Sequence, residues 1–384
     1  MRAALAGLAC ALVVAAPAAA TSTDGAVRFF RVANSAFDDF TRAPTPASCQ
    51  WMRSKYARML VYTPYFDSRL GCFADAWVYK DLYAIYPSSA IAGAHPEWIL
   101  RDPGGRQLFI PYDCGGGTCP QLAADVGSPA FRAQWIADAR AVLAKGYRGL
   151  FVDDVNMLIS RVSDGNGRPV APVDPRTGKE MRERDWRRAL ADFVEQIRAE
   201  LPTTELVHNA LWFAGHDDPD VQRQLESASV INLERGVNDD GLRGGSGQFG
   251  FDAFLAYVDW LHARGKAVIF DGGARTKEQR EYGLAAYFLV SADGDYLGND
   301  RGGRPDDWWP AYEVSLGAPL GPRRIWNGLL RRDFADGMVL VNPPDAPRQS
   351  IDLAREWRDL DGRARARVTL EAADGIVLRK ADVG

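Results

Sequence analysis

Short apolar runs alternate with longer amphipathic segments along most of the chain, and this alternation predicts the fold. The clearest run is 149–156, where Leu, Phe and Val follow a glycine and end at two aspartates and an asparagine. A short apolar run bounded by glycine and polar residues is typical of a strand that is buried on both faces. The sequence predicts seven further strands, at 27–33, 58–63, 76–81, 205–209, 229–234, 266–271 and 294–297.

Helical spacing of apolar residues is visible between several of these strands. Ser128 and Pro129 have the pattern of a cap and a first helical residue, and Gly146 ends the segment that they open. Phe131 and Trp135 share one face of this predicted helix, so we expect both to pack in the core. Further helices are predicted near 186–197, 217–227, 254–261 and 276–289, the last of which opens with the spacing of a capping box.

The alternation of strands and helices argues for a parallel sheet, and eight units argue for an α/β fold of the (β/α)8 TIM-barrel type. An open doubly wound sheet is the alternative, but no glycine-rich phosphate loop follows the first strand. Short runs at 337–342, 366–370 and 376–378 have no helices between them and predict a small C-terminal antiparallel β annex. We therefore expect a barrel over 21–325 and the annex over 326–384.

Residues 1–20 have the pattern of a signal peptide, with Arg2, an apolar stretch and three alanines at the end. The apolar stretch is too short to span a membrane, so we expect a secreted or periplasmic protein. A formal net charge of −4 gives no indication of a nucleic-acid partner or of an anionic membrane surface. We expect a monomer without a cofactor.

Four cysteines remain after the signal segment: Cys49, Cys72, Cys114 and Cys119. An even number in an oxidising compartment predicts two disulfides. The short Gly-rich loop between Cys114 and Cys119 favours that pair and leaves Cys49 to pair with Cys72, although four cysteines allow three pairings. A zinc site is the alternative, but the spacing lacks two ligand pairs and histidine is scarce.

Polar residues end the best-defined strands: Asp153 or Asp154, Asn209, Glu234 and Asp271. In a barrel these positions surround the mouth at the C-terminal face, where active sites of this fold lie. Because gathered like charges cost stability, we interpret the acids as functional rather than as caps of strand ends. His208 is the only histidine near a strand end, which disfavours a metal-dependent hydrolase but leaves an acid-only Mg²⁺ or Ca²⁺ site open.

Two acids across a cleft with aromatic walls suit glycoside hydrolysis. One carboxylate attacks or activates water, and the other donates a proton to the leaving oxygen. Sugars stack on aromatic faces, and Trp212 and Trp308 lie in predicted loops that can supply such walls or simply pack as lids. No Gly-x-Ser-x-Gly motif is present, which disfavours a serine esterase.

Four motifs in order, at 78–81, 95–98, 124–127 and 149–156, resemble a family of bacterial glycoside hydrolases. This family is often labelled hypothetical glycosyl hydrolases, and it is assigned TIM barrels related to polygalactosaminidase-like enzymes. The segment 331–343 resembles the terminal strand unit that follows such barrels. The resemblance implies a glycoside hydrolase with the acid of the fourth strand at its centre. Together with the signal segment, it leads us to expect an exported enzyme that cleaves a glycosidic bond in a polysaccharide or oligosaccharide.

Because side chains alternate along a strand, we expect Asp153 and Asp154 to point to opposite faces, with Asp153 at the mouth and Asp154 as the rival. Glu234 is the candidate acid/base residue, and we expect its protonated form to be favoured by burial. An ion pair at the barrel rim is the alternative role for Lys80 with Asp81. The candidates for substrate binding are Tyr62, Lys80, Asp81, Asn156, Asn209, Trp212, Asp271 and Trp308.

Two other classes of protein remain open. One is a TIM barrel of the cell envelope that binds a glycan without cleaving it, and the other is a structural envelope protein. The acids at Asp153, Asp154 and Glu234 argue against both, since a binder needs donors and aromatic platforms rather than two opposed acids.

Overall fold

The computed structural model describes residues 26–33, 41–298 and 308–381, and the expected signal peptide lies outside them. Eight strands form one parallel sheet in the order β1-β2-β3-β6-β7-β8-β9-β10. Phe29 pairs with Leu297, whose N–H donates to the Arg28 carbonyl at 2.8 Å, so the first and last strands meet and the barrel closes. The predicted TIM barrel is confirmed. Its strands are β1 (Phe30–Val32), β2 (Arg58–Val61), β3 (Ala76–Asp81), β6 (Gly149–Val155), β7 (Glu205–Ala210), β8 (Val230–Glu234), β9 (Ala267–Asp271) and β10 (Tyr296–Leu297).

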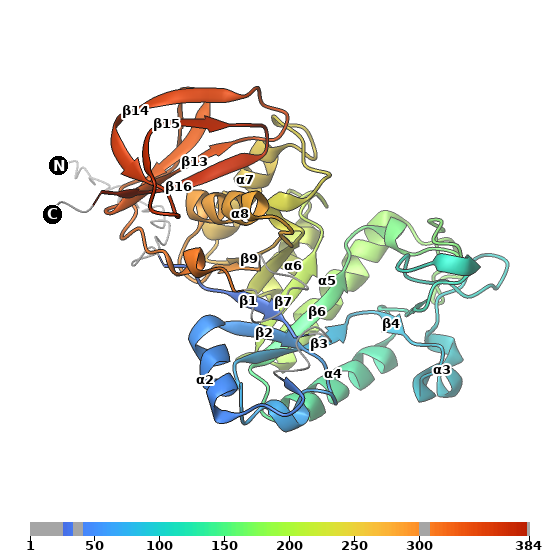
Figure 1. Cartoon of the computed structure of the whole chain (residues 1–384). Coiled ribbons are helices and arrows are strands. Elements are labelled where there is room, and N and C mark those ends of the chain that lie inside the picture. The colour runs from blue at the N-terminus through green and yellow to red at the C-terminus, as the bar shows by residue number, and fades with distance from the viewer. Residues whose placement is uncertain (1–25, 34–40, 299–307, 382–384) are drawn as a thin grey trace, which may run out of the picture.

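Amphipathic helices cover the outside of the barrel (Figure 1). Ser128 Oγ accepts a hydrogen bond from the Phe131 N–H, so the first predicted helix starts as its cap indicates. Phe131 and Trp135 are buried and pack edge-on against Phe193 of the next helix, with ring centroids 6.0 and 5.6 Å away. Their expected place in the core is confirmed. The helices are α2 (Pro46–Lys55), α4 (Pro129–Leu143), α5 (Glu183–Glu200), α6 (Pro219–Ser227), α7 (Phe251–His262) and α8 (Lys277–Val290).

The N-terminal end of the barrel interior is closed by packing and by a partly exposed ion cluster. Leu60, Trp77, Phe151, Val207 and Ile269 fill the centre. Below them the Glu205 carboxylate accepts hydrogen bonds from Arg58, from the Trp77 indole at 2.7 Å and from Arg148 at 2.9 Å. Apolar side chains therefore leave only the C-terminal end of the barrel open to polar chemistry.

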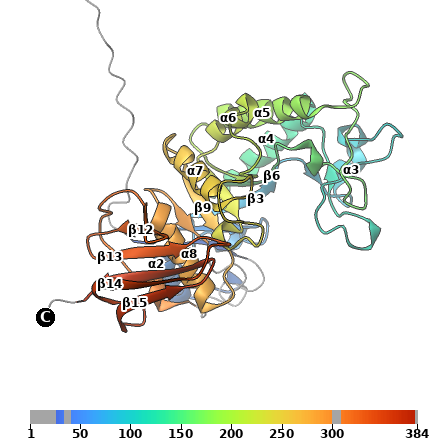
Figure 2. The same cartoon turned by 90° about the horizontal axis from the view of Figure 1, so that it is seen from above.

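A long excursion follows β3 and lies on the side of the barrel away from the C-terminal sheet (Figures 1 and 2). It carries β4 (Ala84–Ile85), α3 (Ala90–Ala94) and β5 (Leu122–Ala123), and β4 and β5 pair antiparallel. Phe109 bridges both Leu122 and Ser163, which joins the excursion to the loop that follows β6. The loop-rich stretch of the sequence thus has a fold of its own beside the barrel.

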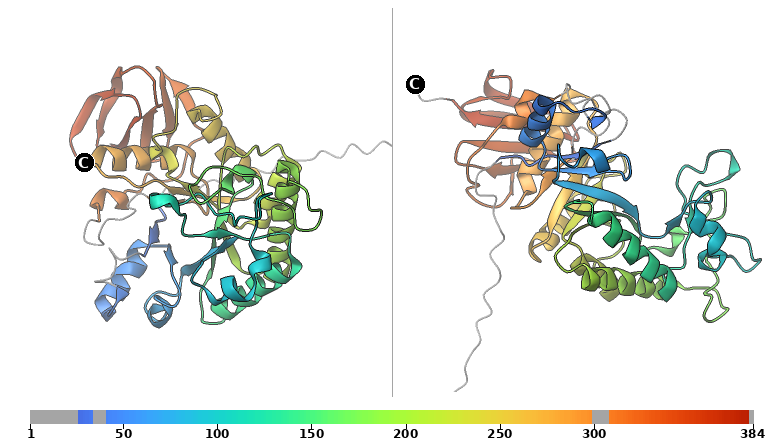
Figure 3. Two further views of the ribbon diagram at one scale, coloured as in Figure 1. Left: turned by 90° about the vertical axis from the view of Figure 1, so that its right-hand side faces the viewer. Right: turned by 90° about the horizontal axis from the view of Figure 1, so that it is seen from below.

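The C-terminal annex is an antiparallel sheet in the order β11-β12-β13-β16-β14-β15, and it packs on α8 (Figure 3). A Cβ on Gly375 would lie 2.9 Å from Ala285 Cβ, so the close approach of β16 to α8 requires glycine there. The annex is confirmed, with three strands beyond the three predicted. Its strands are β11 (Arg324–Trp326), β12 (Leu329–Asp333), β13 (Gly337–Asn342), β14 (Gln349–Arg358), β15 (Ala364–Leu370) and β16 (Asp374–Lys380).

No helix among the described residues is long and apolar enough to cross a membrane.

Candidate active site

Carboxylates and amides from five neighbouring strands meet at the C-terminal end of the barrel. Parallel pairing sets Asp81 beside Asp153, Asn209 beside Asn232, and Glu234 beside Asp271. These six residues and Asp154 are called the mouth cluster below. These residues gather at the C-terminal end of the barrel, where we expected the polar residues at the strand ends to lie.

Asp153 is the carboxylate with the most donors in this cluster. Its Oδ2 accepts from the Tyr79 hydroxyl at 2.7 Å, and its Oδ1 accepts from Asn209 Nδ2 and from the Asp154 N–H, both at 2.8 Å. Three convergent donors suit the ionised form of a carboxylate and hold it in one orientation. The three donors fix the Asp153 carboxyl group in a position that suits a nucleophile or a base.

Tyr79 links Asp153 to a second acid, since its hydroxyl also lies 2.6 Å from Asp81 Oδ1. A phenol donates only one hydrogen bond, so one of the two carboxyl groups must supply the proton for the other contact. Burial raises the pKa of Asp81, and the charge of Asp153 adds to that rise against the donors Tyr79 and Tyr86. The pKa of Tyr79 is raised by burial and by both acids, so the phenol keeps its proton. Asp81 is thus the acid suited to carry the shared proton.

The Asn209 side-chain amide contacts both Asp153 and Glu234, the two acids that we expected on opposite sides of the cleft. Its Nδ2 donates to Asp153 Oδ1 at 2.8 Å and to Glu234 Oε2 at 3.3 Å, while its Oδ1 accepts from Asn232 at 3.0 Å. Because the Asn209 oxygen accepts from Asn232, the Asn209 nitrogen is the end of the amide that faces the acids. Because one nitrogen touches both carboxyl groups, these two oxygens are at most about 6.1 Å apart.

A bulge interrupts β6 where we expected Asp153 and Asp154 to alternate. Val152 pairs with His208 and Val155 with Ala210, so a bulge sets two residues of β6 against one of β7. Asp154 has φ of 57°, a left-handed conformation that L residues rarely adopt. Its carboxyl group accepts a hydrogen bond from Asn156 Nδ2 at 3.0 Å and feels the charges of Asp153 and Asp81. Burial raises the pKa of Asp154 well above its usual value, and the charges of Asp153 and Asp81 add to that rise.

Glu234 ends β8 with an exposed side chain, so the burial that we expected for this acid is not found. The next residue, Arg235, has φ of 69° and turns the chain sharply away from the strand. Positive φ therefore follows directly after both Asp153 and Glu234. Strain of this kind costs about 1–3 kcal/mol and is concentrated at functional sites.

Three other candidates also lie in or beside the mouth cluster. The Tyr62 ring packs against Tyr79 with centroids 5.0 Å apart and is 38% exposed. Asn156 Nδ2 donates to Asp154 Oδ1 at 3.0 Å and holds that carboxyl in place. Asp271 is buried beside Gly298, where an added Cβ would lie 3.0 Å from Asp271 Oδ1.

Lys80 is not at the mouth. Tyr79 and Asp81 point into the barrel, so the residue between them points outward. The ammonium group lies 4.9 Å from the centre of the Trp135 ring on α4, and burial lowers its pKa. The sequence-based assignment of Lys80 to substrate binding is therefore wrong.

Trp308 is also far from the expected wall. Its ring packs edge-on against Phe29, Trp51 and Tyr56, with centroids 4.8 to 6.3 Å apart. Phe29 precedes β1, so this aromatic group covers the outside of the barrel at the start of its strands, opposite the mouth. Burial of the Trp308 ring against the barrel accounts for its position without a bound ligand.

Trp212 follows β7 and lies on the same side of the barrel as the mouth cluster. It forms an aromatic group with Phe213, Phe249 and Phe254, at centroid distances of 5.8, 6.3 and 5.5 Å. Phe249 is 44% exposed, so part of this group faces solvent. Its use as a sugar platform stays a prediction.

Three site residues were not identified from the sequence: Tyr79, Tyr86 and Asn232. Strand periodicity was sufficient for two of them, because Tyr79 shares a face with Asp81, and Asn232 shares one with Glu234. Tyr86 donates to Asp81 Oδ2 at 3.1 Å and accepts from Gln121. Both of these residues come from the long excursion, where no periodicity marks them.

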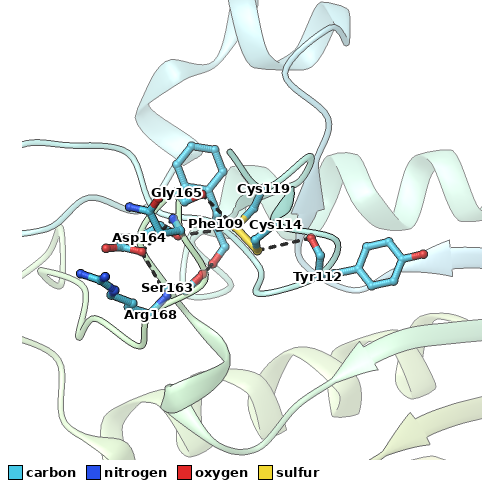
Figure 4. Close-up of a disulfide and its surroundings, with 9 residues drawn as sticks. Phe109, Tyr112, Cys114, Cys119, Ser163, Asp164, Gly165 and Arg168 are labelled. Atoms are coloured by element: carbon cyan, nitrogen blue, oxygen red, sulfur yellow. Dashed lines mark hydrogen bonds between the residues drawn. A yellow bond between two sulfur atoms is a disulfide. The ribbon is translucent and has the colours of Figure 1, made fainter. Parts of the chain in front are cut away.

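The structure contains two disulfides, Cys49–Cys72 and Cys114–Cys119. Figure 4 shows the second one, with Asp164 and Gly165 beside it. Cys119 Sγ lies 3.6 Å from the Asp164 carbonyl oxygen, and Tyr112 next to the bridge is 63% exposed. The disulfide thus closes a loop that packs against the segment after β6.

No group of three or more His, Cys, Asp or Glu side chains in the described part of the chain is arranged to hold a metal ion. His208 is buried between β7 and α6, and burial lowers its pKa to about 3, so its ring is neutral.

Comparison with known proteins gives one family and a shared fold. A profile of the hypothetical glycosyl hydrolase family 15 matches residues 78–338, more than half of the chain. No curated protein matches.

Solved structures that resemble this chain are distant in sequence. The glycoside hydrolase domain of PelA from Pseudomonas aeruginosa is 18% identical, with a TM-score of 0.43 over 77% of this chain and 98% of that one. The maltogenic α-amylase AmyB from Thermotoga neapolitana is 11% identical, with a TM-score of 0.51 over 91% and 98%. A β-L-arabinopyranosidase from Geobacillus stearothermophilus, in complex with arabinose, is 10% identical, with a TM-score of 0.53 over 93% and 98%. The last two likenesses show the fold alone.

Proposed function

Because the chain belongs to the hypothetical glycosyl hydrolase family 15, we propose that it is an exported glycoside hydrolase that cleaves a bond in an oligosaccharide or polysaccharide. The observation that carries the proposal is the Asn209 amide, which joins Asp153 and Glu234 at the barrel mouth. A binding protein has no need to hold two acids at this separation. The mouth position supports the proposal further, since this is where TIM-barrel enzymes place their chemistry.

In the proposed reaction Asp153 is the nucleophile and Glu234 the acid and base. The Asp153 carboxylate attacks the anomeric carbon while the glycosidic carbon–oxygen bond breaks, and protonated Glu234 gives its proton to the leaving oxygen. Glu234 then removes a proton from water, which attacks the anomeric carbon and releases Asp153. Exposure of Glu234 supports this role, because the group must reach both the leaving oxygen and the water.

The separation of the two carboxyl groups favours retention of configuration. Retaining enzymes hold their acids about 5–5.5 Å apart, and inverting enzymes about 6.5–9.5 Å, to leave room for a water. Asp153 Oδ1 and Glu234 Oε2 lie within about 6.1 Å of each other, which accommodates a retaining pair. We therefore propose a double displacement through a covalent glycosyl–Asp153 intermediate.

Export is supported by the two disulfides, which form and persist in oxidising compartments. The apolar segment of residues 1–20 supports it as well. A secreted or periplasmic location brings the enzyme into contact with extracellular polysaccharide, the substrate class that we propose.

The test is turnover by matched variants. The wild type is incubated with a panel of bacterial exopolysaccharides, and released reducing ends are measured. Glu234→Gln should slow turnover by about 10²–10⁴-fold with glycan affinity largely intact, and Asp153→Asn should do at least as much damage. Glu226→Gln, an exposed acid on α6, is the control and should leave turnover unchanged.

Asp154→Asn separates the two aspartates. Burial and the neighbouring acids raise the pKa of Asp154 and so favour its neutral form, which asparagine copies. This variant should keep turnover within about tenfold of wild type. Full activity in both Asp153→Asn and Glu234→Gln would refute the two-carboxylate mechanism, whereas tight glycan binding without any release of reducing ends would favour the non-catalytic binder.

A further inference from the structure

The annex contains a pocket that shares no residue with the mouth cluster. Its cavity has a volume of about 660 Å³ and is lined by residues 320–380 only. Trp326, Met338, Leu353 and Trp357 form its apolar wall, which continues into the core of the annex sheet. A volume in this range, with an apolar wall and few polar groups, is typical of a ligand site.

The polar groups of this annex pocket are mainly cationic. Arg324 and Arg331 both donate to Asp333, at 2.8 and 2.6 Å, so one carboxylate is shared by two guanidinium groups. Arg355 and Lys380 also line the pocket, and neither is ion-paired in the described part of the chain, although Lys380 Nζ donates to the Ala335 carbonyl. The lining is therefore positive, although the whole chain has a net charge of −4. This local reversal of sign favours an anionic ligand.

Two of the arginines lie over the tryptophans of the wall. The Arg331 guanidinium carbon lies 4.7 Å from the centre of the Trp326 ring, and that of Arg355 lies 4.2 Å from the centre of Trp357. Such stacking holds a guanidinium group beside an apolar surface while its N–H donors stay available for a carboxylate. Leu320, which also lines the pocket, is 68% exposed, so the apolar surface reaches solvent.

We propose that the annex pocket binds a carboxylated oligosaccharide. The carboxylates pair with Arg355 and Lys380, and the apolar faces of the sugar rings pack on the tryptophan wall. Cations that alternate with aromatic rings suit a polymer in which charge and apolar ring faces also alternate. This site does not depend on hydrolysis at the mouth, so it can be tested separately from the proposed function.

Titration calorimetry on the full chain tests the proposal with trigalacturonic acid as the probe. We expect saturable binding that weakens as the salt concentration rises, since the contacts are ionic. The fully methyl-esterified trisaccharide keeps the rings and loses the charges, and it should bind at least about tenfold more weakly. The double variant Arg355→Gln/Lys380→Gln should lose about the same factor. Arg348→Gln removes an exposed arginine outside the pocket and should bind like wild type.

Three results would overturn the proposal: no binding of trigalacturonic acid, equal affinity for its methyl ester, or wild-type affinity in the double variant. Equal affinity for triglutamic acid would also overturn it, because the ligand class would then be an acidic peptide and not a sugar. The melting temperature of each variant is measured beside the titration. If the double variant does not fold, the single variant Lys380→Gln and the salt series on the wild type test the same ionic contacts. The proposal would be overturned if Lys380→Gln bound like wild type and the wild-type affinity did not change with salt.

Discussion

Replacing Glu205 by Gln should destabilise the barrel strongly at neutral pH and much less in acid. Glu205 closes the N-terminal end of the barrel, where Arg58 binds both of its oxygens and Trp77 and Arg148 add further donors. Burial by itself would raise its pKa, but these hydrogen bonds together lower the pKa from 4.5 to about 2. The side chain is 24% exposed, so solvent screens the cluster only partly.

The magnitude follows from the shift in pKa. Each pKa unit corresponds to about 1.4 kcal/mol, so the ionised form of Glu205 contributes about 3 kcal/mol to folding. A lowered folded-state pKa gives stability that is fully present above pH 4.5 and is lost as the pH falls through about 2. The contribution should therefore fall to roughly 1 kcal/mol at pH 3.

Urea denaturation at pH 7 and at pH 3 measures this difference directly. Glu205→Gln should lose about 3 kcal/mol of unfolding free energy at pH 7, and a clearly smaller amount at pH 3. Glu200→Gln, which removes the exposed partner of Arg140, is the control and should lose less than about 1 kcal/mol at either pH. An equal loss for Glu205→Gln at both values would show that the ion cluster does not act through the charge of Glu205.

Two further changes test the packing of the outer layer. Glu281 on α8 accepts a hydrogen bond from the Val377 N–H of β16, and burial raises its pKa to about 7. Ionisation of Glu281 opposes folding as the pH rises from 4.5 to 7. Glu281→Gln should therefore raise the unfolding free energy by up to about 3 kcal/mol at pH 8 and leave it unchanged at pH 4. Equal melting temperatures of variant and wild type at pH 8 would contradict this. Phe131→Ala should cost about 3–5 kcal/mol, because the ring is buried between Trp98 and Phe193. Normal melting with a loss of glycan affinity would place that ring in a binding site instead.

The barrel was predictable because its strands are buried on both faces and appear as unbroken apolar runs. The annex strand β14 was missed for the opposite reason. Its sequence, from Gln349 to Arg358, mixes buried Ile351 and Leu353 with charged residues on an exposed face. A strand of this kind resembles a polar loop until its partners are known.

The site residues that lie at or near strand ends were predictable from the sequence. Asn209, Glu234 and Asp271 end their strands as expected, and the acids of β6 meet them at the mouth. The bulge at Asp154 was not predictable, because it needs positive φ at a residue other than glycine. Lys80 was misplaced although strand periodicity alone sets it on the outer face, next to Asp81 on the inner one.

The most direct test of the central claim is the configuration of the first sugar product. A substrate from the exopolysaccharide panel is mixed with enzyme in an NMR tube, and the anomeric proton signals are followed before mutarotation mixes the two forms. Nucleophilic attack by Asp153, with Glu234 as acid and base, predicts that the first-formed product keeps the anomeric configuration of the substrate. Initial release of the opposite anomer would contradict nucleophilic attack by Asp153 and the mechanism built on it.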